Sequence, residues 1–282
     1  MTEATLDETV LRKWIGNTQS ATDTLTVEPA RLMQATMDHE ASLNSGDCLP
    51  PVWHWLYFLT GAPMSKLGRD GHAALGEFLP PVALPRRMWA GGRLEFAKPV
   101  ELGETINKSS SIKDISLKHG KSGALAFVTV RHSYSGPEGD DRFTEEHDIV
   151  YREDPKPDAP KPAPVSPSSA TPQHSETITP STVQLFRYSA LTFNSHRIHY
   201  DRDYCKDVEG YPGLIFHGPL TATLLADLAV RRIGGKPLKS FSFRAVAPLF
   251  DNAPFTIHHD GEGTVWAETP EGGLAMKANF EV

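Results

Sequence analysis

The sequence predicts an α+β fold built from two copies of one unit, in which an antiparallel sheet wraps around a long helix. Three observations indicate this fold. A proline-rich segment, residues 155–172, divides the chain into two halves. Each half has one apolar, helix-like stretch and several strand-like stretches separated by turn residues. A short pattern also recurs, because residues 93–104 and 243–252 each lead from a strand into a proline, an apolar pair and an acidic turn.

The proline-rich segment sets the expected domain boundary. It has seven prolines in 18 residues, a density that excludes a helix or the interior of a sheet and favours an extended spacer. We therefore expect an N-terminal domain over residues 1–154, a linker over residues 155–172 and a C-terminal domain over residues 173–282.

The N-terminal half begins with a polar, helix-like segment at residues 8–15 and a strand at residues 23–27. The apolar, aromatic run at residues 51–60 predicts a buried helix, and it reads as core rather than as a ligand site. Turn residues separate the strands that follow, which is typical of an antiparallel meander, at residues 87–96, 105–118, 124–135 and 142–151.

The C-terminal half repeats this order. A strand at residues 176–180 and an apolar segment at 182–188 precede a cluster of histidines. The long helix is expected at residues 219–232, where leucines recur near one face. Strands are expected at residues 238–246, 253–259, 263–268 and 274–282.

Composition excludes several classes of protein. A net charge of −7 argues against a nucleic-acid partner bound by bulk electrostatics. No apolar run reaches the length of a membrane span, and the acidic N-terminus lacks the pattern of a secretory signal. Cys48 and Cys205 lack the spacing of a metal or redox motif. We therefore expect a cytoplasmic protein that binds neither nucleic acid nor membrane.

The strongest chemical signal is the stretch of residues 191–201, which places Asn194, His196 and His199 within six positions. Histidine titrates near neutrality, so His199 is our first candidate for proton transfer. Asn194 cannot carry a proton, but it could hold the attacking water or a thioester carbonyl; equally, it could be a turn residue. His196 and His199 lack a third nearby metal ligand, so we predict no metal site.

His217, Gly218 and Pro219 follow the histidine cluster and begin the predicted helix. A helix N-terminus carries unpaired N–H groups and a positive dipole, which could stabilise an enolate oxygen on a thioester. Glycine allows close approach, and proline suits the first helical turn. Arg86 and Arg87 follow a proline-rich stretch and could hold phosphates or a carboxylate, or could be a solvated pair.

The cluster resembles the motif of the MaoC-like R-specific enoyl-CoA hydratases, roughly Gly-Asp-x-Asn-Pro-hydrophobic-His with a later His-Gly helix start. By this resemblance the catalytic histidine falls on His199 and the oxyanion glycine on Gly218. The family's catalytic aspartate falls on Asn194, so the sharing of catalysis between an aspartate and a histidine does not carry over intact. Either His199 transfers protons alone, or Asp201 or another carboxylate substitutes.

Three longer motifs, residues 78–92, 192–201 and 209–220, together resemble a two-domain group. The group includes itaconyl-CoA hydratases, mesaconyl-C4-CoA hydratases and hydroxyacyl-thioester dehydratases. The resemblance implies a double hot dog with a catalytic C-terminal half, an N-terminal half that helps to form the acyl-CoA tunnel, and a homodimer. It makes four residues candidates for substrate binding: Arg86, Arg87, Arg197 and His217.

These observations predict a reversible, cofactor-free hydro-lyase that acts on an acyl-CoA thioester. The resemblance favours a branched C5 dicarboxylyl-CoA, itaconyl-CoA or mesaconyl-C4-CoA, with citramalyl-CoA as the hydrated partner. The alternatives are a 3-hydroxyacyl-thioester dehydratase of fatty-acid synthesis, a thioesterase, and an acyl-CoA-binding module without activity. No Gly-x-Gly-x-x-Gly or Walker-type loop occurs, which argues against a nucleotide cofactor.

Overall fold

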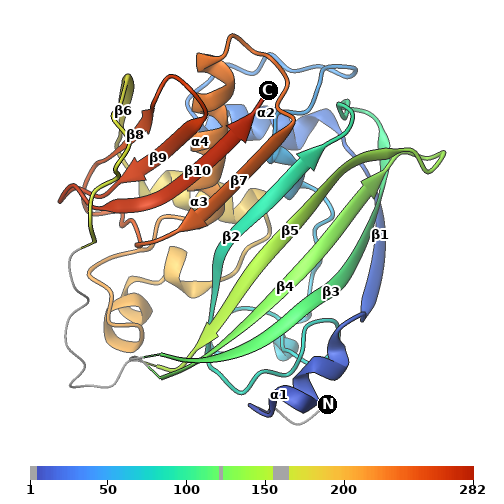
Figure 1. The fold of residues 1–282 in the computed structure, drawn as a ribbon, viewed down its shortest axis with the longest axis vertical. Coiled ribbons are helices and arrows are strands. Elements are labelled where there is room, and N and C mark those ends of the chain that lie inside the picture. The colour runs from blue at the N-terminus through green and yellow to red at the C-terminus, as the bar shows by residue number, and fades with distance from the viewer. Residues whose placement is uncertain (1–4, 121–122, 155–164) are drawn as a thin grey trace.

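The computed structural model describes residues 5–120, 123–154 and 165–282 (Figure 1). The first half contains two helices, α1 (Glu8–Leu11) and α2 (Val27–Thr36), and short 3₁₀ turns that include η2 (Trp53–Leu56). Its strands are β1 (Thr18–Thr24), β2 (Arg86–Phe96), β3 (Thr105–Gly120), β4 (Gly123–Ser135) and β5 (Asp141–Arg152).

The second half contains the helices α3 (Thr182–Leu191) and α4 (Gly218–Arg232) and the short turns η4 (Arg197–His199) and η5 (Tyr204–Val208). Its strands are β6 (His174–Ile178), β7 (Ser240–Ala245), β8 (Phe255–His259), β9 (Thr264–Glu268) and β10 (Leu274–Glu281). Helix α4 is apolar along most of its length and packs against β7 to β10, as expected for the central helix of a hot dog.

The ten strands form one antiparallel sheet in the order β1-β3-β4-β5-β2-β7-β10-β9-β8-β6. The helices α2, α3 and α4 lie behind this sheet in Figure 1. The two expected sheets are therefore joined edge to edge, through the pairing of β2 with β7. Gly91 and Gly92 permit this junction, because a Cβ atom there would lie 2.5 Å from the carbonyl oxygen and 2.6 Å from the ring of Phe243, respectively.

The prediction of a buried helix at residues 51–60 is wrong. Only the single 3₁₀ turn η2 forms, because Val52 and Phe58 adopt left-handed backbone conformations, with φ of 65° and 56°, on either side of it. The segment is buried nonetheless, since its aromatic rings pack in the core. The helix of the first half is α2, so the strand expected at residues 23–27 ends early: β1 stops at Thr24, and Val27 begins the helix.

The remaining expected elements agree closely with the structure. The segment at residues 182–188 forms α3. Ser181 caps the N-terminus of this helix, because its side chain accepts a hydrogen bond from the Val183 N–H. The linker stays a prediction, because residues 155–164 lie outside the described residues; residues 165–172 contain neither helix nor strand. Apolar residues of both halves, among them Leu94 and Leu220, pack in a shared core, and a second apolar cluster that includes Ile115 and Val128 lies within the first half.

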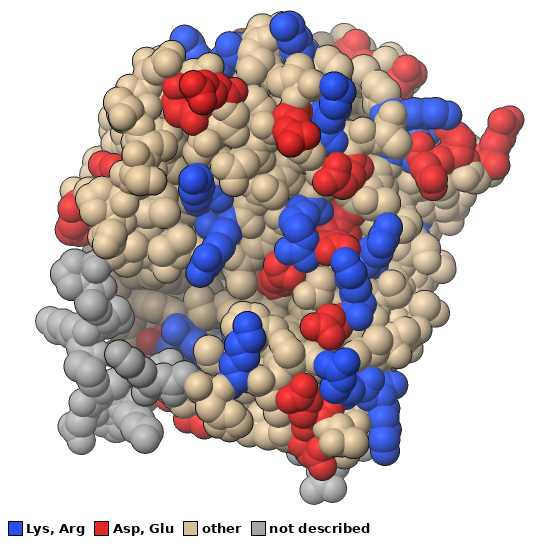
Figure 2. Space-filling view, viewed as in Figure 1, with Lys and Arg blue, Asp and Glu red and all other residues tan. Residues whose placement is uncertain are grey.

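The outer face of the sheet is polar. Figure 2 shows lysines and arginines interspersed with acidic residues across it. Arg93 of β2 bonds to Glu146 and Asp148 of β5 on this face. Because side chains alternate along a strand, Glu145 and His147 point to the opposite side of the sheet, where Glu145 meets His54 and Trp55 of η2. Among the described residues, no helix is long and apolar enough to cross a membrane.

Candidate active site

His199 lies at the end of η4 with only 6% of its surface exposed. Its Nδ1 donates a hydrogen bond to the carbonyl oxygen of Ile215, at 2.8 Å. A carbonyl oxygen can only accept, so Nδ1 carries the proton and Nε2 keeps a free lone pair. Burial lowers the pKa of His199 to about 4. The ring is therefore neutral at pH 7 and can accept a proton at Nε2.

His217 fixes the plane of this ring. The two imidazoles stack with centroids 3.7 Å apart and an angle of 18° between their planes. His217 is fully buried, and its Nε2 bonds to the Ser189 hydroxyl at 2.9 Å. Its Nδ1 has no hydrogen-bond partner among the described residues. Burial, followed by the proximity of His199, lowers the pKa of His217 well below its usual value.

Gly218 begins α4 directly after this stacked pair, with Pro219 in the first turn. Within the described part of the chain, the N–H groups of Gly218 and Leu220 make no hydrogen bond, and the first bonded amide is that of Thr221, which donates to His217. Unpaired donors and the positive end of the helix dipole thus face the region next to His199. A proton acceptor beside an anion-stabilising helix end is what the addition of water to a thioester-activated double bond requires.

Asn194 is occupied within a turn. Its Oδ1 accepts a hydrogen bond from the His196 N–H at 3.0 Å, and its own N–H donates to the carbonyl oxygen of Ser189 at 2.8 Å. The structure thus matches the turn role that the sequence left open for Asn194.

Asp201 does not orient His199, whose Nδ1 is held by Ile215. Its Oδ2 accepts from the Arg197 guanidinium at 2.7 Å, and its Oδ1 accepts from the Tyr204 N–H at 3.0 Å. Arg197 also donates to the carbonyl oxygen of Arg69 and lies over the Tyr204 ring. Asp201 and Arg197 therefore hold the local chain in place.

The two neighbouring arginines lie in different environments. Arg86 is 6% exposed and bonds to the Glu209 carboxylate and to the Glu209 carbonyl oxygen, each at 2.6 Å. Arg87 is partly exposed, and no carboxylate pairs with it among the described residues. Both arginines line a small cavity of about 50 Å³, together with Asp70, His196 and Ile215, but Arg86 is paired there with Glu209. Of the two, Arg87 is the cation placed to meet a ligand.

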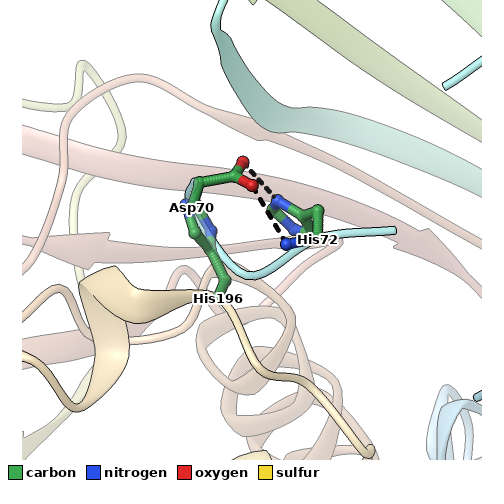
Figure 3. Close-up of side chains that lie close together, drawn as sticks. All are labelled: Asp70, His72 and His196. Atoms are coloured by element: carbon green, nitrogen blue, oxygen red, sulfur yellow. Dashed lines mark hydrogen bonds and ion pairs between the residues drawn. The ribbon is translucent and has the colours of Figure 1, made fainter. Parts of the chain in front are cut away.

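The structure also brings in two residues that the sequence did not single out. Asp70 and His72 come from a loop of the first half and lie against His196, as Figure 3 shows. His72 Nδ1 bonds to Asp70 Oδ2 at 2.7 Å. The rings of His72 and His196 are 4.2 Å apart, and those of His196 and His199 are 5.5 Å apart. The only sequence feature that could have pointed to Asp70 and His72 is their Asp-Gly-His triplet within a glycine-rich stretch.

The donor atoms of Asp70, His72 and His196 lie within 4.8 Å of one another, a spacing that could suit a metal. Asp70 Oδ2 and His72 Nδ1 already bond to each other, however, which arranges this pair for orienting a histidine rather than for coordinating an ion. Burial, followed by the proximity of His72, lowers the pKa of His196 to about 2, so this ring is also neutral.

A second polar cluster is buried inside the first half. The Glu145 carboxylate accepts from four groups at 2.6–3.1 Å: His54, Trp55, Tyr134 and His147. Burial alone would raise the pKa of Glu145, but His147 and His54 together lower it well below its usual value. The carboxylate is therefore ionised and compensated within the core.

Comparison with known proteins identifies the family. Residues 52–251 match the family described as hydroxyacyl-thioester dehydratase type 2. The chain belongs to this family. It is 45% identical over 276 residues to the mesaconyl-C(4)-CoA hydratase of Chloroflexus aurantiacus, covering 95% of this chain and 96% of that protein. It is also 32% identical over 244 residues to the mitochondrial hydroxyacyl-thioester dehydratase type 2 of Schizosaccharomyces pombe, covering 78% and 80% of the two chains.

Solved structures agree on the fold. A MaoC-like dehydratase from Phytophthora capsici superposes with a TM-score of 0.69 at 15% identity, covering 98% of this chain and 99% of that one. A Mycobacterium tuberculosis protein described as a double hot dog gives a TM-score of 0.58 at 14% identity, covering 94% and 95% of the two chains. The predicted double hot-dog fold and the predicted membership of the MaoC-like hydratase and dehydratase group are thus confirmed.

Proposed function

We propose that this member of the family reversibly hydrates a branched C5 dicarboxylyl-CoA of the mesaconyl-C4 type, giving citramalyl-CoA. The similarity of almost the whole chain to the Chloroflexus aurantiacus hydratase supports this substrate class. The observation that carries the proposal is Arg87, a cation without a carboxylate partner among the described residues, next to the histidine cluster.

The position of the substrate carboxylate makes Arg87 informative. In mesaconyl-C4-CoA the free carboxylate and the methyl group are both on the β carbon, which is the carbon that receives the hydroxyl group. A water molecule held near His199 therefore brings the substrate carboxylate close to Arg87. A guanidinium can bind a carboxylate through two parallel hydrogen bonds. A straight-chain enoyl-CoA has no group for this contact.

The reaction follows from the geometry of His199 and Gly218. His199 Nε2 takes a proton from water as the water oxygen bonds to the β carbon. The electron pair of the double bond moves onto the thioester, and the Gly218 N–H stabilises the resulting enolate oxygen. The imidazolium of His199 then returns its proton to the α carbon, which regenerates the neutral ring. His217 keeps the His199 ring in plane, and Arg86 and Arg197 hold the surrounding chain.

The test is enoyl-thioester absorbance with the purified protein, comparing mesaconyl-C4-CoA with crotonyl-CoA and supplying citramalyl-CoA for the reverse direction. Arg87→Gln should lower kcat/KM for the C5 substrate about 10- to 100-fold, since a charge-assisted bond contributes about 1.5–3 kcal/mol. Its kcat/KM with crotonyl-CoA should be nearly unchanged. Arg131→Gln, which replaces an exposed arginine of β4, is the matched control.

A dehydratase of straight-chain 3-hydroxyacyl thioesters is the second candidate, favoured by the description of the matching family and by the fission-yeast relative. Faster turnover of crotonyl-CoA, unaffected by Arg87→Gln, would establish it instead. Release of CoA from a saturated acyl-CoA would indicate a thioesterase, and binding without turnover would indicate a binding module. The homodimer and the cytoplasmic location stay predictions, to be checked by light scattering and by cell fractionation.

A further inference from the structure

The loop that carries Asp70 and His72 is fixed on the catalytic segment by its backbone. The Arg197 N–H donates to the carbonyl oxygen of Asp70 at 2.8 Å, and the Ser195 hydroxyl donates to that of Gly71 at 2.5 Å. These bonds join residues more than 120 positions apart in the sequence. The loop of the first half is thus held against the segment that carries His199.

Gly71 makes this approach possible. It has a φ of +89°, and a Cβ atom on it would lie 2.0 Å from the carbonyl oxygen of Ser195. No side chain fits in that space, so the backbone of the loop touches the catalytic segment directly. The positions of the residues on either side of Gly71 are therefore set by main-chain contact rather than by flexible side chains.

Asp70 holds His72 in one orientation. Its Oδ1 accepts from the His72 N–H at 3.0 Å, and its Oδ2 bonds to the His72 ring at Nδ1. Burial would raise the pKa of Asp70, but the hydrogen bonds from His72 lower it far below its usual value, so the carboxylate is ionised. It can only accept, which puts the ring proton on Nδ1 and leaves Nε2 free.

The arrangement supplies what position 194 lacks. The MaoC pattern has an aspartate where this chain has Asn194, whose side chain is used in a turn. Asp70 and His72 arrive at the same cluster from the other half of the molecule. The ring of His196 lies near both histidines, with its centroid 4.2 Å from that of His72 and 5.5 Å from that of His199. Figure 3 shows His72 and His196 beside Asp70.

We propose that His72 is a second catalytic histidine and that Asp70 is its positioning residue. This inference rests on the proposed hydration reaction and assigns a chemical role to the first half. Nε2 of His199 takes one proton of the attacking water, while Nε2 of His72 accepts a hydrogen bond from the other O–H. The second O–H bond stays intact and becomes the product hydroxyl, so no further proton acceptor is needed. His72 aims the lone pair of the water at the β carbon.

The test compares His72→Ala, Asp70→Asn and wild type for kcat and KM with the best substrate of the wild-type protein. His72→Ala should lower kcat about 100-fold and Asp70→Asn about 10-fold, with KM changed less than about twofold. Added imidazole should restore part of the kcat of His72→Ala, because it can occupy the vacated volume and accept the same hydrogen bond. His174→Ala is the matched control, since its histidine also bonds a carboxylate two residues away, at 2.8 Å, but on β6.

Several outcomes would overturn the inference. The first is a wild-type kcat in both variants. The second is a loss of kcat that added imidazole does not restore, together with a parallel rise in KM. If His72→Ala does not fold by circular dichroism, His72→Gln replaces it, and wild-type kcat in that variant also refutes a catalytic role. A wild-type protein that hydrates no enoyl-CoA at all refutes the proposed function itself, and this inference falls with it.

Discussion

Acidification from pH 7 to pH 5 should destabilise the fold strongly, because several histidines are buried in the neutral form. Burial lowers the pKa of His132 to about 2 and that of His199 to about 4. In the unfolded chain both titrate near 6.5. Protons therefore bind the unfolded state first as the pH falls below 6.5. The stability that these rings contribute is complete above pH 6.5 and is lost as the pH falls toward their folded-state pKa values.

The size of the effect follows from proton linkage. At pH 5 a site with an unfolded pKa of 6.5 and a folded pKa near or below 4 favours unfolding by roughly 2 kcal/mol. His132 and His199 together thus cost about 4 kcal/mol, and His217, whose pKa is also lowered, acts in the same direction. Typical domains have a total stability of only about 5–15 kcal/mol. A large fraction of the free energy of unfolding should therefore disappear within two pH units.

Urea unfolding followed by tryptophan fluorescence at pH 7, 6 and 5 measures this loss. His132→Gln removes one of the titrating sites, so the slope of the unfolding free energy between pH 6 and 5 should fall by about 1 kcal/mol per pH unit. His39→Gln, which replaces an exposed imidazole, is the matched control. A free energy of unfolding that stays constant from pH 7 to 5, or an equal slope in His132→Gln and wild type, would refute the reasoning.

Three substitutions test other parts of the structure. Gly71→Ala should lower kcat at least about 10-fold by pushing its loop from Ser195, whereas Gly46→Ala, with the same φ of +89° but open space around it, should retain kcat. Asn194→Ala should lower the free energy of unfolding by about 1 kcal/mol in urea titrations while the remaining folded enzyme keeps its kcat; a large loss of kcat would show that this side chain touches the substrate. Glu145→Ala should lower the free energy of unfolding by about 3–5 kcal/mol, since it leaves four donors without their acceptor, of which those of His54 and Tyr134 are buried, and a melting temperature equal to that of wild type would contradict this.

The fold could be predicted wherever one periodicity extends over a long segment. The alternating strands of both halves and the leucine-rich helix α4 form close to their expected positions. The aromatic run at residues 51–60 failed because periodicity reports burial, and it cannot reveal the left-handed conformations of Val52 and Phe58 that interrupt a helix. The junction of the two sheets depends on the contact of Gly91 and Gly92 with β7, which only the folded chain brings together.

The candidate site could be predicted where its residues are close in sequence. His199, His217 and Gly218 follow from one local motif, and the structure stacks the two rings beside the helix start. Arg86 and Arg87 were expected to act together, and both line the small cavity beside His196. They differ in their partners, which the sequence does not show: Arg86 pairs with Glu209, whereas no carboxylate pairs with Arg87 among the described residues.

The two histidine–carboxylate clusters differ in burial and in how many groups the carboxylate binds, and these differences distinguish a site from a core. Glu145 accepts four hydrogen bonds, so its lone pairs are occupied, and each donor is fixed by the bond that it makes. Both carboxylate oxygens of Asp70 accept hydrogen bonds from the single residue His72, and the Nε2 atom of that ring stays free to bind another group. A closed network leaves no such free acceptor, whereas the role proposed for His72 toward the attacking water uses one. Sequence composition does not separate these cases, because each cluster combines a carboxylate with two histidines; the hydrogen bonds at each carboxylate do separate them.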